Sequence, residues 1–199
     1  EAAENLASTI RIGGLQLELE ELRSNVVGAQ LGSAAIETSL KAGVIGLAII
    51  FVFMCIVYLL PGLVSSIALL IYTGIVIVLL NAFNITLTLP GIAGIILGIG
   101  MAVDANVIIF ARVREEISMG ISVKTALKNG FQKATSAIVD GNVTTLIAAL
   151  VLWLKGSGTV KGFAQTLALG IIVSMFTALV ITRLIIFAFY AIGIHDVKF

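Results

Sequence analysis

One aspartate lies in the middle of a long apolar run, where a charged side chain is energetically costly if the run spans a membrane. The run GIILGIGMAVDANVIIFARVREE, from Gly94 to Glu116, carries Asp104 near its centre and ends in charged residues. A charge at the centre of a bilayer costs roughly 2.5 kcal/mol or more, so it usually faces a bundle interior and serves a function. We therefore predict that Asp104 binds and releases a proton; the alternative is a neutral, hydrogen-bonded structural residue.

The composition is that of a membrane protein. Of the 199 residues, 59% are hydrophobic and 12% are charged, whereas about a quarter of the residues in soluble domains are charged. The net charge of +1 and the lack of a basic cluster with interleaved aromatics argue against nucleic-acid binding. The single cysteine, Cys55, can build neither a disulfide framework nor a metal site, and no cofactor is expected.

About 20 apolar residues are needed to cross the hydrocarbon core of a bilayer. The apolar runs predict an all-α bundle over residues 40–193 with five transmembrane helices. The spans are residues 40–60, 63–81, 90–110, 134–154 and 163–190. Between the third and fourth spans, residues 112–133 are amphipathic, and we expect them to lie along the cytoplasmic interface.

Residues 1–39 are polar and read as a lead-in from outside the membrane. Leu15, Leu17 and Leu19 alternate with polar residues, which is the pattern of a half-buried strand. A lone strand is not stable, so we expect it to be the remnant of an extracellular domain whose upstream part is absent. The Lys/Arg bias of residues 112–133 makes that side cytoplasmic, so the lead-in lies outside and the tail 194–199 inside.

Small and polar residues recur at helical spacing around Asp104. On a helix of 3.6 residues per turn, its face is shared by Ala93, Leu97, Gly100, Ile108 and Ala111. Gly94, Gly98 and Gly100 are predicted to let neighbouring helices approach closely.

The later spans offer hydroxyl groups that could form a proton relay with Asp104. The candidates are Thr144 and Thr145 in the fourth span, and Ser174 and Thr177 in the fifth. They could close a polar pocket around the carboxylate, or equally satisfy backbone carbonyls within their own helices. Secondary candidates are Asn142, Asp140 and Arg183, where Asp140 could act as an interfacial cap or pair with Arg183.

The charged residues that close the third apolar run, Arg112, Arg114, Glu115 and Glu116, are expected to form a solvated helix end. No catalytic signature is found: the sequence has no phosphate-binding loop, no H-E-x-x-H and no nucleophile with a histidine partner. The chain is therefore expected to be a transport component and not an enzyme.

Three blocks of the sequence resemble consecutive blocks of the SecD/SecF family of protein-export membrane subunits. They are GMAVDANVIIFARVREEI, AIVDGNVTTLIAALVLW and GTVKGFAQTLALGIIVSMFTALVITR. The VDANV form favours the SecD branch. The lead-in LQLELEELRSNVVGAQLGSAAIETSLKAG resembles the end of the family's periplasmic domain, although it lacks the proline-containing form common there.

The resemblance implies five of the six helices in one half of a resistance-nodulation-division-type membrane unit. It also implies a SecF partner, a SecY-type channel, an exported polypeptide as cargo, and a bacterial or archaeal cytoplasmic membrane. Asp104 matches the family's intramembrane aspartate, implicated in proton conduction driven by the proton motive force. Thr144 and Thr145 match its paired threonines, and Arg114 and Glu115 its R-E-E end.

Two other functions remain open on the sequence. One is a related proton-coupled exporter of small molecules or lipids, which should carry substrate-binding loops between the first two helices of each half. The other is a passive scaffold of the translocation channel, which should tolerate loss of the Asp104 carboxyl.

Overall fold

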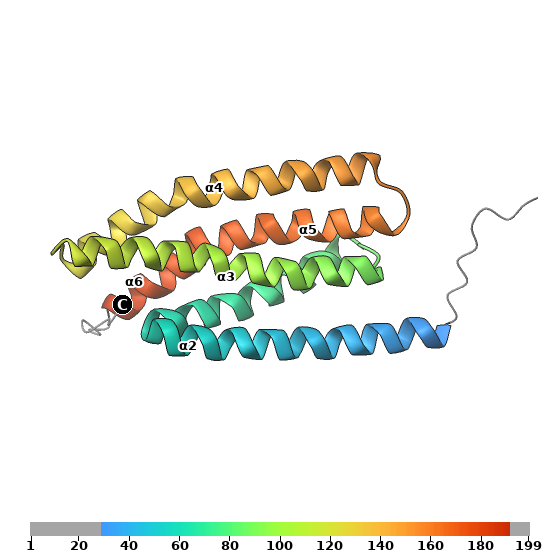
Figure 1. The fold of residues 1–199 in the computed structure, drawn as a ribbon, viewed down its shortest axis with the longest axis horizontal. Helices are drawn as coiled ribbons and strands as arrows, with labels where there is room; N and C mark the ends of the chain where they lie inside the picture. Colours follow the sequence, from blue (N-terminus) through green and yellow to red (C-terminus); the bar gives the residue numbers. More distant parts are fainter. Residues whose placement is uncertain (1–28, 192–199) are drawn as a thin grey trace, which may run out of the picture. The chain divides into compact units, whose positions relative to one another are not determined.

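The computed structural model describes residues 29–191, and their side chains from Ala34 onward. The chain divides into two units, residues 1–33 and 34–199, and the described helices belong essentially to the second. The regular elements of the described part are all helices, joined by short connections (Figure 1). The elements are α2 (Ala29–Ala82), α3 (Leu89–Ser118), α4 (Val123–Lys155), α5 (Thr159–Phe176), the π-helix η1 (Thr177–Thr182) and α6 (Arg183–Ala191). The strand predicted around Leu15–Leu19 lies outside the described residues.

Four helical stretches in this part are long and apolar enough to cross a membrane, judged by length and composition: Ala34–Ala82, Leu89–Ser118, Val123–Lys155 and Thr159–Ala191. The sequence predicts five spans, because it divides the first of these stretches at Pro61-Gly62. The structure places a break in α2 at Leu59, which has φ 49° and ψ −117°. The α2 ribbon turns back on itself there (Figure 1).

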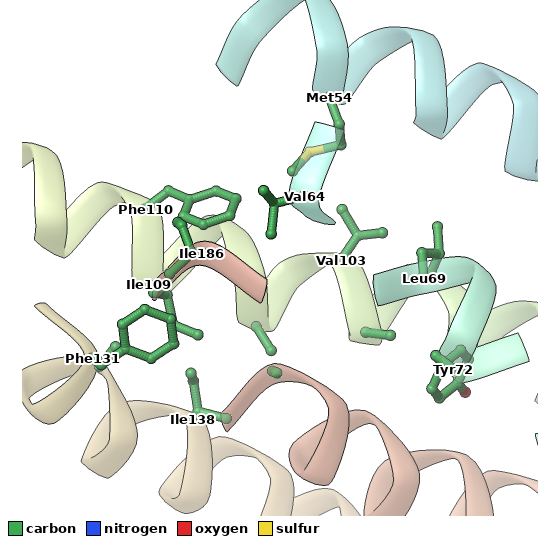
Figure 2. Packing of buried hydrophobic residues seen from close by; sticks show 14 of the residues in the cluster. Met54, Val64, Leu69, Tyr72, Val103, Ile109, Phe110, Phe131, Ile138 and Ile186 are labelled. Atoms are coloured by element: carbon green, nitrogen blue, oxygen red, sulfur yellow. The ribbon is translucent and has the colours of Figure 1, made fainter. Parts of the chain in front are cut away.

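The chemistry of Pro61 and Gly62 accounts for this break. Proline has no backbone N–H and disfavours helical geometry in the residue before it. Gly62 is needed for a close approach, because a Cβ atom there would lie only 1.9 Å from the Met54 carbonyl oxygen. The two arms of α2 meet through Met54 and Val64, both buried in the main apolar core (Figure 2).

Helix α3 lies at the centre of the bundle. It begins with Pro90 in its first turn, and the Thr88 side chain accepts a hydrogen bond of 3.1 Å from the Gly91 N–H. Its buried side chains pack with those of α2, α4 and α6, and Figure 2 shows Ile109 and Phe110 close to Phe131 and Ile186.

The amphipathic segment 112–133 does not form a separate helix. Helix α3 continues to Ser118, a short turn with Gly120 at φ +82° follows, and α4 then runs unbroken from Val123 to Lys155. Apolar side chains of the segment 112–133 pack inside the bundle: Val113, Leu127 and Phe131 are all buried. A Cβ atom at Gly130 would lie 2.4 Å from a Val113 methyl carbon, so α3 and α4 are in close contact here.

Candidate functional site

Asp104 lies midway along α3 but points out of this chain. Its neighbours Val103 and Ala105 are buried, whereas Asp104 itself is exposed. Exposure continues along the same face: Ala93, Leu97 and Ala111 are exposed, and no atom lies within 4 Å of a Cβ atom built at Gly100. We call this surface, made of Ala93, Leu97, Gly100, Asp104 and Ala111, the Asp104 face.

The predicted hydroxyl pocket is not assembled around Asp104 within the chain. Ser174 and Thr177 are 1% and 2% exposed, on the buried side of α5 and η1. Within residues 34–191, Asp104 takes part in no hydrogen bond or ion pair with a described side chain. The interior hydroxyls and the carboxylate therefore occupy different environments in the isolated chain.

All four predicted relay hydroxyls donate to carbonyl oxygens of their own helices. Thr144 and Thr145 donate to Asp140 and Gly141 at 3.0 and 3.2 Å. Ser174 and Thr177 donate to Ile171 and Val173 at 2.8 Å each. This is the second of the two interpretations left open by the sequence. The oxygen atoms keep free lone pairs, so each hydroxyl can still accept a hydrogen bond.

Helix α4 places a second exposed polar surface near the level of Asp104. Val113 contacts Gly130, and Met101 packs in one cluster with Leu146 and Ala149. Because the helices are antiparallel, Asp104 and the stretch 140–144 both lie between these two contacts. Asp140, Gly141 and Thr144 are exposed there. Small and polar residues of α4 are thus exposed at the same height along the bundle as Asp104.

The secondary candidates have local partners. The Asn142 amide donates to the Ile138 carbonyl at 2.7 Å, and Asp140 accepts from Ser136 at 3.3 Å. The proposed pair between Asp140 and Arg183 is not formed. The Arg183 guanidinium instead lies 6.0 and 5.9 Å from the ring centres of Phe131 and Phe187.

The glycines differ in their surroundings. A Cβ atom at Gly94 would lie 2.4 Å from the Thr166 hydroxyl oxygen and 3.2 Å from the Phe163 carbonyl oxygen. At Gly98 it would lie 2.5 Å from the Tyr72 hydroxyl and 3.7 Å from Gly170 Cα. These two glycines lie at close helix contacts, whereas Gly100 faces open space.

A buried polar pair beside Asp104 was not predicted. Thr182 donates to the side-chain oxygen of Asn106 at 2.9 Å, and the Asn106 amide donates to the Ala102 carbonyl at 3.2 Å. Asn106 is 2% and Thr182 0% exposed. Thr182 ends η1, a π-helical stretch of a kind often found at functional sites. The sequence feature that could have indicated this pair is the amide side chain of Asn106, two residues after Asp104 in an otherwise apolar run.

Glu116 corrects the prediction of a solvated helix end. It is 2% exposed, and it accepts hydrogen bonds from Lys133 at 2.5 Å and from Asn129 at 2.9 Å. These bonds, that of Lys133 foremost, lower the pKa of the Glu116 carboxyl below its ordinary value. Its neighbour Glu115 does behave as predicted, since it forms an exposed ion pair with Arg112 at 2.8 Å. The pair Glu116–Lys133 thus joins α3 to α4 just beyond the predicted span 90–110.

The described part contains no group of three His, Cys, Asp or Glu residues that could hold a metal ion. Long apolar helices packed around α3, with Asp104 exposed midway along it, are the features of a membrane-protein bundle.

Comparison with known proteins gives the family. Residues 11–191 match the family described as "Protein export membrane protein SecD/SecF, C-terminal", and the chain belongs to this family. It is 52% identical over 184 residues to the protein translocase subunit SecD of Acidaminococcus fermentans, covering 92% of this chain and 44% of that protein. It is 50% identical over 183 residues to SecD of Synechocystis sp., covering 92% of this chain and 39% of the relative.

A solved structure has the same fold. The crystal structure of SecDF from Thermus thermophilus, described as a translocon-associated membrane protein, matches with a TM-score of 0.83 at 36% identity, covering 96% of this chain and 27% of that one. The chain therefore spans less than half the length of these relatives. Their names describe subunits of protein translocation, and the matched family model is the C-terminal one.

Proposed function

We propose that this chain is the membrane bundle of a SecD-type subunit that uses the proton motive force to assist polypeptide export. Asp104 is the proton-coupling group in this proposal. The observation that carries it is an exposed carboxylate in the middle of a long apolar helix, with no cation paired to it among the described residues. A carboxylate at such a depth is costly unless it has a task.

The exposed Asp104 face calls for a covering partner. The proposal assigns this role to SecF, with a SecY-type channel and the exported polypeptide as further partners. Three of the five residues of the face, Ala93, Gly100 and Ala111, are small and would let another helix approach closely. Polar groups from that partner, together with Thr144 of α4, would then form the polar pocket that this chain alone does not close.

The proposed topology has five spans in a cytoplasmic membrane, with the break at Leu59 separating the first two. The N-terminal lead-in is outside and the C-terminus inside. The positive residues at the junction of α3 and α4, such as Arg112, Arg114 and Lys124, favour this orientation.

The test is export of a secreted protein from membrane vesicles with and without a proton gradient, using the full-length parent. Asp104→Asn keeps the shape of the side chain and removes the titrating proton, so stimulation by the gradient should disappear. Glu115→Gln removes a carboxylate outside the predicted span and should leave it intact. Normal gradient-dependent export by Asp104→Asn would refute proton coupling at this residue and favour a passive scaffold.

A further inference from the structure

A basic cavity lies between α4 and the η1–α6 segment, away from the Asp104 face. Its volume is about 410 Å³, and its lining residues are Lys128, Phe131, Gln132, Thr135, Leu179 and Arg183. Two of the six side chains are cations and none is an acid. Lys128, Gln132 and Arg183 are exposed, so the cavity opens at the surface of the chain.

Arg183 lies at cation–π distance from two aromatic rings. Its guanidinium lies over the rings of Phe131 and Phe187, and Phe131 is only 2% exposed. The guanidinium donates no hydrogen bond to a described residue, so the N–H groups around its edge stay available. Such an edge suits the two oxygens of a phosphate group, to which arginine binds in a bidentate manner.

The nearby acids do not neutralise this cavity. Glu115 pairs with Arg112, Glu116 pairs with Lys133, and Asp140 accepts from Ser136. Neither Lys128 nor Arg183 forms an ion pair with a described residue. Lys124, one helical turn before Lys128, adds a third positive charge to the same side of α4. The cluster is thus left with positive charge that an anion would balance.

The surroundings of the cavity favour a lipid as the source of that anion. Val180 and Leu184 flank Arg183 in the chain and are 40% and 66% exposed. An anion bound at Arg183 would have apolar surface beside it, where acyl chains could lie. Basic pockets between transmembrane helices are a known type of site for acidic lipid headgroups.

From these observations we propose that the cavity between Lys128 and Arg183 binds the phosphate headgroup of an anionic phospholipid. Arg183 contacts the phosphate through its N–H edge, Lys128 adds a flexible positive charge, and the Gln132 amide can donate a hydrogen bond. The site would attach the first turns of α4 and the start of α6 to the membrane surface. It is independent of proton coupling at Asp104.

The test is native mass spectrometry of the 199-residue chain in detergent, with phosphatidylglycerol and phosphatidylcholine titrated in parallel. We expect selective retention of phosphatidylglycerol. Lys128→Gln should weaken that binding about fivefold, and adding Arg183→Gln should weaken it about fivefold again, since each charge near a membrane surface contributes about that factor. The matched control Lys155→Gln with Lys161→Gln removes two charges at the other end of the bundle and should leave retention unchanged.

Lys128 is exposed, so its single variant should fold normally, and an unchanged melting temperature without lipid verifies this. Equal retention by Lys128→Gln and the unmodified chain would overturn the proposal. So would an equal loss in the Lys155–Lys161 control, which would show that only net charge matters. Displacement of the lipid by millimolar inorganic phosphate would show that the cavity takes a free anion and not a lipid.

Discussion

Three glycines on one helix allow the packing of α3 to be tested with a single type of substitution. Gly94 and Gly98 lie at close contacts, and Gly100 has no atom within 4 Å of an added Cβ. Glycine to alanine raises helix propensity by about 1 kcal/mol wherever it is made in a helix interior. That gain is common to the variants, so differences between them report packing alone.

The expected magnitude follows from what the new methyl group meets. At Gly94 it lies 2.4 Å from the Thr166 hydroxyl oxygen and 3.2 Å from the Phe163 carbonyl oxygen, so both a side chain and the backbone of α5 must shift. Overpacking of this kind costs about 1–3 kcal/mol. Gly94→Ala should therefore be about 1–3 kcal/mol less stable than Gly100→Ala, and the latter should be at least as stable as the unmodified chain.

Unfolding of the purified chain in mixed detergent micelles, followed by loss of helical circular dichroism, measures this difference. The double variant Gly94→Ala with Thr166→Ala removes the nearer obstacle and should recover part of the loss, because residues in contact are energetically coupled. Equal stabilities of Gly94→Ala and Gly100→Ala would refute the close packing of α3 against α5.

Three further outcomes are expected. Thr182→Val should destabilise the bundle by about 1–3 kcal/mol in the same assay, since it leaves the buried Asn106 oxygen without a donor, whereas Thr182→Ser should not. Because the folded-state pKa of Glu116 is lowered, its contribution is complete at neutral pH, above the ordinary carboxyl pKa, and is lost as pH falls through the folded value. Melting temperatures taken down an acid series should thus fall less steeply for Glu116→Gln, and identical slopes would contradict this. Gly100→Leu should abolish co-purification with a SecF-type partner while the chain still folds, and unchanged co-purification would argue against the Asp104 face as the contact.

Much of the helical layout could be predicted from hydropathy and local signals. The start of α3 at Thr88–Pro90 follows from proline's suitability for a first turn, and the cap by Thr88 agrees with it. The break in α2 was expected at Pro61-Gly62 and lies two residues earlier, at Leu59, since a proline inside a helix disrupts the turn that precedes it. The π-helical geometry of Thr177–Thr182 has no signature in the sequence.

The surroundings of the α3–α4 junction could not be predicted from the sequence pattern. Amphipathicity shows that a helix has an apolar face, but it does not say whether that face meets a membrane surface or another helix. Residues 112–133 were expected along the interface, which stays a prediction; the structure shows that Val113 and Phe131 of their apolar face pack within the bundle. Glu116 was expected in solvent, and this prediction was wrong. Its partner Lys133 lies 17 residues away in the next helix, and a sequence pattern does not show which residues of two helices meet.

For Asp104, too, the sequence pattern does not show what the face that carries it contacts. Helical periodicity groups Ala93, Leu97 and Ala111 with the exposed Asp104, whereas Ile108 of the predicted face packs partly against the core. The partner hydroxyls were sought within this chain. Ser174 and Thr177 lie on the buried side of their helices and are satisfied by their own backbone, while Asp104 remains exposed. An exposed carboxylate among apolar residues is unfavourable in lipid, and no described side chain of this bundle pairs with it. In a membrane it therefore requires a second surface that supplies polar groups, and coupling through Asp104 would belong to the assembly and not to this bundle alone.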